Sequence, residues 1–147
     1  MPRDESTQLT VLDASVAVRW VVSEEGSAEA AELLERELTW IAPRLLMTEA
    51  ASALRRKVAD GAIDPAVAGQ SLDALLQAVA DGVIRLVDDE RIIAQALLLA
   101  ISLQHKVPDC VYLALAEREG ASIATADDRL TRLARRRGVT VHRVPHG

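Results

Sequence analysis

The sequence predicts a three-layer α/β domain with a central, mainly parallel sheet of four or five strands flanked by helices. Short apolar runs alternate with longer stretches of helical periodicity, which is typical of a parallel sheet covered on both faces. Of the 147 residues, 50% are hydrophobic and 27% are charged, as expected for one compact hydrophobic core. Because the chain has no internal repeat or low-complexity linker, we expect a single domain over residues 1–147, with a polar N-terminal tail at 1–8.

The N-terminal part of the chain predicts a strand, a helix and a second, short strand. Residues 9–12 form an apolar run that stops at Asp13, which is typical of a buried strand followed by a sharp turn. Ser15 is positioned to cap a helix that begins there. The stretch 27–37 has Ala and Leu on one helical face and Glu and Arg on the other, and it begins with a Ser that can cap it, which predicts an amphipathic helix. Residues 40–42 form a short strand candidate.

Two consecutive helices then predict a helical hairpin. Pro43 opens the first helix, which runs to about Ala59 and is closed by an Asp-Gly pair. Asp64 and Pro65 start the second helix, which runs to about Ala80 and ends at another Asp-Gly pair.

The C-terminal part of the chain continues the alternation of strand and helix. Strand candidates lie at 83–87, 122–125 and 139–142, and helix candidates at 91–104, 108–119 and 128–137. Three acidic residues, 88–90, precede the first of these helices. Acids at a helix N-terminus are commonly stabilising, and a second acidic centre is the alternative interpretation.

The charge balance excludes a generally basic nucleic-acid clamp. The net charge is −5, from 22 acidic and 17 basic residues, and 15 of the basic residues are Arg. Arg is the side chain best suited to bidentate phosphate contacts, and a genome of high GC content would produce the same excess of Arg. The single cysteine, Cys110, excludes an internal disulfide and a Cys-based zinc site. No apolar run is long enough to cross a bilayer and the acidic start is unlike a signal peptide, so we expect a cytoplasmic protein without a membrane partner.

Four acidic residues stand at positions that favour a ligand site. Asp13 and Asp127 directly follow strand candidates, and parallel sheets bind ligands beyond the carboxyl ends of their strands. Glu49 and Asp109 each interrupt an apolar helical face with a carboxylate. Alternatives remain open, because an Asp after a strand can cap the next helix, and an Asp in a first helical turn is favoured by the helix dipole. Glu49 could instead pair with Arg44 or lie at the edge of the core.

Converging carboxylates repel one another and therefore need a cation. Several oxygen ligands without a His or Cys cluster suit Mg²⁺ or Mn²⁺. Such a site can activate water and neutralise charge on a phosphodiester, which predicts metal-dependent nuclease or phosphatase chemistry. Thr125 could add a hydroxyl to this place, and the role of Asp128 is open.

The order and spacing of these motifs resemble the PIN domain. The motifs are Asp13-Ala14-Ser15-Val16, Pro43 followed by Glu49 and Ala53-Leu54-Arg55-Arg56, Pro108-Asp109-Cys110-Val111-Tyr112-Leu113-Ala114-Leu115-Ala116, and Thr125-Ala126-Asp127. More narrowly, the sequence resembles VapC-type ribonuclease toxins of bacterial toxin–antitoxin pairs, over about residues 9 to 144.

This resemblance implies a PIN-like fold and a Mg²⁺- or Mn²⁺-dependent endoribonuclease toxin that a cognate antitoxin neutralises. The family's acidic positions match Asp13, Glu49, Asp109 and Asp127, and its hydroxyl positions match Ser15 and Thr125. Family members commonly form homodimers, and we expect the helical hairpin at 44–80 to contribute. Val107-Pro108 stands where many relatives have an aromatic residue, so the family's substrate contacts are not carried over.

Arginines near the four acids are the candidates for RNA contact. They are Arg19, Arg44, Arg55 and Arg56. The run 135–137 either meets RNA phosphates or stabilises the end of its helix. The three His residues lack ligand spacing and are expected at the surface, and Cys110 is expected to pack in the core. The alternative function is a non-catalytic module whose acidic pocket binds a basic partner segment, such as an Arg of an antitoxin.

Overall fold

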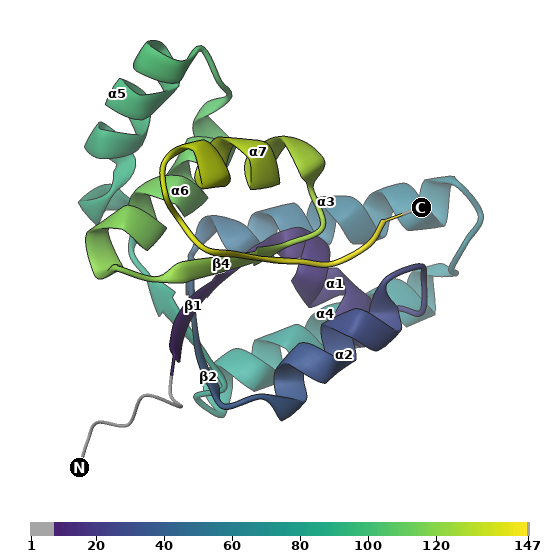
Figure 1. Ribbon diagram of the computed structural model, residues 1–147. Helices are drawn as coiled ribbons and strands as arrows, with labels where there is room; N and C mark the ends of the chain where they lie inside the picture. The colour runs from purple at the N-terminus through teal and green to yellow at the C-terminus, as the bar shows by residue number, and fades with distance from the viewer. Residues whose placement is uncertain (1–7, 147) are drawn as a thin grey trace.

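The computed structural model describes residues 8–146, and its five strands form one parallel sheet in the order β3-β2-β1-β4-β5 (Figure 1). The strands are β1 (Gln8–Leu12), β2 (Leu38–Pro43), β3 (Ile84–Val87), β4 (Ser122–Thr125) and β5 (Val141–Arg143). The helices are α1 (Ala14–Val21), α2 (Ser27–Glu35), α3 (Leu45–Ala59), α4 (Pro65–Ala80), α5 (Ile93–Leu103), α6 (Val107–Glu119) and α7 (Asp128–Arg136), with a short 3₁₀ turn, η1 (Asp89–Arg91). The predicted three-layer α/β fold is confirmed.

Two hydrophobic clusters cover the two faces of the sheet. Helices α5, α6 and α7 pack on one face, and α1, α2, α3 and α4 pack on the other (Figure 1). Successive strand residues point to opposite faces. In β1, Val11 joins the first cluster and Leu12 the second, and in β4 Ile123 and Ala124 divide in the same way. Burial on both faces explains why these strands read as continuous apolar runs in the sequence.

The predicted signals for the end of the first hairpin helix and for both ends of the second hold. The side chain of Asp64 accepts a hydrogen bond from the Val67 backbone N–H at 2.9 Å, and Pro65 is the first residue of α4. Asp60 ends α3 and Asp81 ends α4. Within the described residues no helix is long and apolar enough to cross a membrane.

Two predicted serine caps are wrong. Asp13, in an extended conformation, occupies the N-cap position of α1, and Ser15 lies inside the first turn. Gly26, at φ +91°, occupies the N-cap position of α2, while the Ser27 hydroxyl accepts from the Glu24 N–H and donates to the Val22 carbonyl. Glycine is favoured at Gly26 because a side chain would strain this left-handed backbone, and a Cβ would also overlap the carbonyl oxygen of Pro145.

Several predicted boundaries shift by a few residues. Pro43 is the last residue of β2 rather than the start of a helix, because its register partner Val87 extends the sheet to this point. The helix expected from 91 begins only at Ile93, after η1. The last strand occupies 141–143, where it pairs with β4. Gln8 begins β1 opposite Leu38, so the predicted tail at 1–8 is one residue too long, and residues 1–7 lie outside the described part of the chain.

Candidate active site

A cleft of about 360 Å³ lies at the carboxyl ends of the central strands, and all four predicted acids line it. Asp13 follows β1 and Asp127 follows β4, and these strands are neighbours with Leu12 opposite Ala124. Glu49 reaches the cleft from α3, and Asp109 reaches it from the first turn of α6. Four separate elements therefore bring their carboxylates to one place, as the strand-end and helix-face patterns predict.

Asp13 is the most buried of the four acids, with 7% of its surface exposed. Its Oδ2 accepts hydrogen bonds from the Ser15 hydroxyl at 2.5 Å and from the Thr125 hydroxyl at 2.7 Å. Burial raises the pKa of Asp13, the two hydroxyl hydrogen bonds lower it, and the negative charges of Asp127 and Asp109 raise it further, so that the pKa is above its ordinary value.

Backbone amides fix the direction of these two hydroxyl groups. The Ser15 oxygen accepts a hydrogen bond from the Ala126 N–H at 2.9 Å, and the Thr125 oxygen accepts one from the Asp127 N–H at 3.0 Å. Each hydroxyl thus has its acceptor site occupied by a backbone donor and its own hydrogen available for Asp13. Ser15 and Thr125 hold one face of the Asp13 carboxylate in place.

Glu49 is half-buried and is held by Tyr112. The Tyr112 hydroxyl, itself buried, donates to Glu49 Oε1 at 2.7 Å. Burial raises the pKa of Glu49, the Tyr112 hydrogen bond lowers it, and the charges of Asp13 and Asp109 raise it again, with Lys106 opposing them. Burial and the negative charges of Asp13 and Glu49 raise the pKa of the Tyr112 hydroxyl well above its ordinary value, so it remains a hydrogen-bond donor.

Arg44 is not the partner of Glu49, which settles one alternative left open by the sequence. Its Nε donates to Asp88 Oδ1 at 2.6 Å, on the segment that follows β3. The Asp88 side chain holds the Arg44 pKa above its ordinary range, and the Arg44 guanidinium holds the Asp88 pKa below its own. The backbone N–H of Leu45 donates to Asp89 Oδ2 at 3.1 Å, so these two acids fasten the start of α3.

Asp109 has a partner that the sequence did not suggest. His105 Nε2 lies 2.8 Å from Asp109 Oδ2, one helical turn away along the chain. The expectation that His105 is a surface residue is wrong, because only 18% of its side chain is exposed. Gln104 ends α5 in a left-handed conformation, with φ of 53°, and this turn brings His105 against the start of α6.

Asp127 and Asp128 have different surroundings despite being adjacent. Asp127 lines the cleft and also caps α7, since its Oδ1 accepts from the Arg129 N–H at 2.8 Å. Asp128 binds the Arg143 and His146 side chains instead. These hydrogen bonds hold the pKa of Asp128 below its ordinary range. Asp128 therefore fastens the C-terminal segment rather than lining the cleft.

Each of the four carboxylates uses one oxygen for a protein hydrogen bond. The bonded atoms are Asp13 Oδ2, Glu49 Oε1, Asp109 Oδ2 and Asp127 Oδ1. Within residues 8–146 the second oxygen of each acid has no hydrogen-bond partner, and none of these four atoms is sealed off from solvent. The four side chains are thus oriented by one atom and open to a ligand at the other.

The donor set suits Mg²⁺ or Mn²⁺, because every open atom is a carboxylate oxygen. Among the described residues, no three His, Cys, Asp or Glu side chains are gathered closely enough to hold a metal ion as they stand. Mg²⁺ keeps several of its waters and takes only one or two carboxylates directly, so its binding does not require all four acids to touch it.

The arginines predicted to contact RNA are spread over the surface. Arg56 lines the acidic cleft, together with Lys106, which the sequence interpretation missed. Arg19 lines a neighbouring hollow next to Asp127, but its guanidinium already donates to the Ser15 and Glu25 carbonyls. Arg44 is paired with Asp88 as described above, and Arg55 lines a separate groove between α3 and α4.

The comparison with known families identifies this architecture. The model of the PIN domain matches residues 10–136, which is most of the chain and a range that contains the four acids. The chain belongs to the PIN domain family. PIN domains are generally nucleases and typically use divalent metal ions. No curated protein matches this PIN domain significantly in sequence.

Solved structures share the fold of this PIN domain. PAE2754 from Pyrobaculum aerophilum is 22% identical with a TM-score of 0.68, over 94% of this chain and 88% of that one. VapBC2 from Rickettsia felis, bound to a DNA fragment from its promoter, is 12% identical with a TM-score of 0.61, over 93% of this chain and 99% of that one. FitAcB from Neisseria gonorrhoeae is 16% identical with a TM-score of 0.56, over 90% and 95%. At these low sequence identities, the structural similarity establishes the fold of this PIN domain and no more.

Proposed function

We propose that this PIN domain is a VapC-type endoribonuclease toxin that hydrolyses RNA phosphodiester bonds with Mg²⁺ or Mn²⁺. The observation that carries the proposal is the cleft in which four carboxylates from four elements each keep one oxygen open. The family match supports it, as does the fold shared with VapBC2 from Rickettsia felis and with a toxin–antitoxin complex from Klebsiella pneumoniae.

In this proposal Asp13, Glu49, Asp109 and Asp127 would hold the metal ion, one or two of them directly and the others through its waters. When bound, the ion supplies Lewis-acid chemistry, lowering the pKa of water and neutralising phosphate charge. Water, rather than the neighbouring 2′-hydroxyl, attacks the phosphorus and the P–O3′ bond breaks, with the 3′ oxygen taking up a proton, so the products carry 5′-phosphate and 3′-hydroxyl ends.

The remaining cleft residues position these groups and the substrate. Ser15 and Thr125 keep the open oxygen of Asp13 directed at the cleft, through the hydrogen bonds that they donate to its other oxygen. Arg56 and Lys106 are the cations on the cleft wall, and they would bind the phosphodiester beside the acids. Tyr112, buried behind Glu49, is a positioning residue rather than a substrate contact.

A cognate antitoxin and a second copy of the chain are the proposed protein partners. Large apolar side chains are exposed on the predicted hairpin, where Leu76 is 48% exposed, and on α5, where Leu98 and Ile101 are 68% and 66% exposed. Exposed apolar surface of this kind is typical of protein interfaces. Light scattering of the purified chain, alone and with the antitoxin, measures both associations.

The test of the nuclease compares the wild type with Asp109→Asn and Asp13→Asn on labelled RNA. Cleavage is expected with Mg²⁺ or Mn²⁺, and EDTA and either substitution should abolish it. Asp128→Asn is the matched control, because Asp128 follows the cleft residue Asp127 in the sequence but its own side chain binds Arg143 and His146. Cleavage that survives EDTA would contradict the mechanism.

The same experiment separates the nuclease from a non-catalytic acidic module. The open carboxylate oxygens could also accept hydrogen bonds from a guanidinium of a partner segment. A wild-type chain that never cleaves RNA, but binds an Arg-containing antitoxin segment through Asp13 and Asp109, would establish the binding module instead. Sequencing of cellular RNA ends after a brief pulse of expression, with Asp13→Asn as control, identifies the target RNA.

A further inference from the structure

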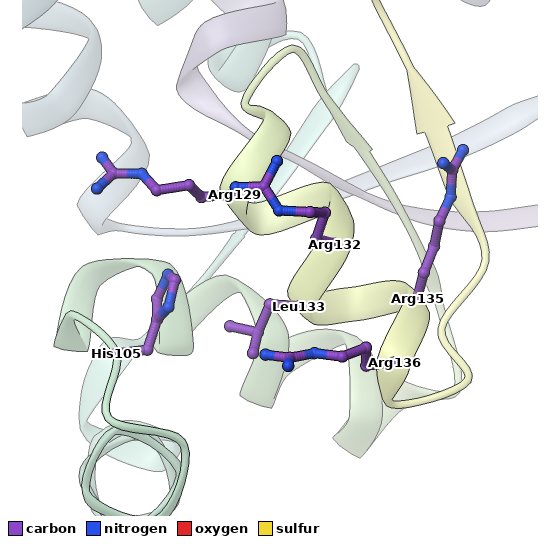
Figure 2. Close-up of a pocket in the computed structure, with 6 residues that line it drawn as sticks. All are labelled: His105, Arg129, Arg132, Leu133, Arg135 and Arg136. Atoms are coloured by element: carbon purple, nitrogen blue, oxygen red, sulfur yellow. The ribbon is translucent and has the colours of Figure 1, made fainter.

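A second concave surface lies beside α7, outside the acidic cleft. It encloses about 480 Å³ between α7 and the turn that precedes α6 (Figure 2). Its lining residues are His105, Leu133, Arg129, Arg132, Arg135 and Arg136. In Figure 2, Arg129, Arg132 and Arg136 extend from α7 toward the side of His105, whereas Arg135 extends away from it. We call this surface the α7 groove.

The arginines of the α7 groove have no acidic partner in the part of the chain that the structure describes. Within residues 8–146, none of the four makes an ion pair or a side-chain hydrogen bond, while the next arginine, Arg137, is bound by Glu117 at 2.7 Å. The helix dipole favours cations in the last turn, which accounts for Arg135 and Arg136. It does not account for Arg129 and Arg132, which lie nearer the N-terminus of α7. Arg129, Arg132 and Arg136 are three and four positions apart, and like charges at these spacings destabilise a helix. A bound anion would relieve this repulsion.

Two contacts connect the α7 groove to the acidic cleft. His105 lines the groove and contacts Asp109 at 2.8 Å. Arg129 also lines the groove, and its backbone N–H donates to Asp127 at 2.8 Å. Arg129 further lines the hollow that contains Ser15 and Asp127. The basic surface therefore begins where the acidic cleft ends.

We propose that the α7 groove binds the phosphodiester backbone of the RNA strand on one side of the bond that is cut. The proposal rests on the nuclease function proposed above. Arg129, Arg132 and Arg136 have the i, i+3, i+7 spacing of one helical face and span about 10 Å. The planar guanidinium groups match phosphate oxygens in pairs.

The chemistry of the α7 groove favours contact with the backbone over the bases. No Trp, Tyr or Phe side chain lines it, and the one aromatic ring in its lining, the imidazole of His105, is hydrogen-bonded to Asp109. Trp20 and Trp40, which pack edge to face against each other, belong to the layer on the opposite side of the sheet. Without a Trp, Tyr or Phe platform for the bases, the groove adds affinity and sets the path of the strand but does not select a sequence. Its continuity with the acidic cleft favours the RNA strand over an acidic protein segment as the occupant.

The experiment measures RNA binding by fluorescence anisotropy in the Asp109→Asn background, which keeps the probe intact. The probe is a labelled single-stranded RNA of about 12 nucleotides, within the usual range of site sizes. The test variant is Arg132→Ala with Arg136→Ala. The control is Arg85→Ala with Arg91→Ala, which removes the same charge from exposed positions. Arg85 lies in β3 and Arg91 shortly after it, and β3 is the edge strand at the far side of the sheet from β5.

The expected loss follows from the release of counterions. Each phosphate contact to a single strand contributes about 0.7 to the slope of log K against log salt, so two lost contacts reduce the slope by about 1.4. At about 0.1 M salt, this corresponds to roughly 25-fold weaker binding. The control variant should change binding less than about threefold. In the cleaving background, the Arg132/Arg136 variant should raise KM and leave kcat nearly unchanged.

Each outcome separates this proposal from the nuclease proposal. If the wild type cleaves RNA in an EDTA-sensitive manner and the Arg132/Arg136 variant binds RNA as the control does, the groove proposal fails and the nuclease stands. If that variant keeps RNA affinity but loses the antitoxin, the groove is a protein-docking surface and the proposal is overturned. If the wild type never cleaves RNA, the nuclease proposal fails, whatever the groove binds.

Discussion

Asp13→Asn should make the metal-free protein more stable at neutral pH. Asp13 is almost fully buried, and its pKa is raised by burial and by the charges of Asp127 and Asp109, against the hydrogen bonds of Ser15 and Thr125. Asn has the same shape. Its carbonyl oxygen can accept both hydroxyl hydrogen bonds, and its amide can take the place of Oδ1, which has no hydrogen bond among residues 8–146.

The magnitude is the difference between two opposing effects. Each hydroxyl hydrogen bond weakens by about 1 kcal/mol when its acceptor loses its charge, a cost of about 2 kcal/mol for the pair. Relief from burying a carboxylate contributes several kcal/mol in the other direction. Because the pKa of Asp13 is raised, the second effect is larger. We expect a net gain of about 1–2 kcal/mol in the free energy of unfolding, or roughly 2–8 °C in Tm.

The gain should depend on pH with a definite sign. The folded-state pKa of Asp13 is above its unfolded value of about 3.8, so the folded state holds the proton more tightly. This contribution to stability is complete below the unfolded pKa and is lost as pH rises through the folded pKa. The stability difference between Asp13→Asn and the wild type should therefore be small at acidic pH and grow toward neutral pH.

Asp128→Asn is a control with the opposite sign. The His146 and Arg143 hydrogen bonds lower the pKa of Asp128, so its contribution to stability is present above the unfolded pKa and is lost as pH falls. This substitution should slightly reduce stability at neutral pH, and the reduction should disappear on acidification.

Urea unfolding followed by circular dichroism, in EDTA over a series of pH values, measures these differences. A parallel series with excess Mg²⁺ tests the metal site, since a ligand at about 100 times its Kd stabilises the folded state by about 2.7 kcal/mol. The wild type should gain this stability, and Asp13→Asn should gain little of it. An Asp13→Asn protein that is less stable than the wild type in EDTA at neutral pH would refute the reasoning, as would a stability difference independent of pH.

Two further substitutions test the hydrogen bond behind Glu49 and the backbone at Gly26. Tyr112→Phe removes a hydrogen bond that lowers the Glu49 pKa, so the pKa of Glu49 should rise. Calorimetric titration should then show Mn²⁺ binding about 10–100-fold weaker than in the wild type. Unchanged Mn²⁺ affinity would exclude Tyr112 as a positioning residue. Gly26→Ala strains a left-handed backbone by about 1–2 kcal/mol and overlaps Pro145, so scanning calorimetry should show a Tm lower by at least roughly 2–8 °C. Gly69→Ala, in the helix α4 and free of contacts, should instead raise it slightly.

The positions of the four acids could be predicted because each depends on a local rule. Asp13 and Asp127 follow strands, and parallel strands place their carboxyl ends at one edge of the sheet. Glu49 and Asp109 interrupt apolar helical faces, and those faces must pack toward the sheet. The periodicity of the sequence therefore determines which side of each element the carboxylate occupies.

The contacts that orient these acids could not be predicted, because they join elements that are distant in sequence or depend on single backbone torsions. Tyr112 reaches Glu49 across 63 positions, and no local pattern pairs them. His105 meets Asp109 because Gln104 adopts a left-handed conformation, which is uncommon for a residue with a side chain. The i, i+4 spacing of His105 and Asp109 was the one signal in the sequence that could have suggested this pair.

The hydrogen bond between Thr125 and Asp13 also sets a time scale for making the active site. It spans 112 positions, and at about 5–20 residues per second the ribosome needs roughly 6–22 s to synthesise the chain between them. Strands β1 and β2 can pair early in translation, but β4 and Asp127 emerge only in the last part of synthesis. A nascent chain lacks both the Thr125 hydroxyl, one of the two that orient Asp13, and the fourth acid. Under the function proposed above, a chain still on the ribosome would therefore be unable to cut the messenger RNA that encodes it.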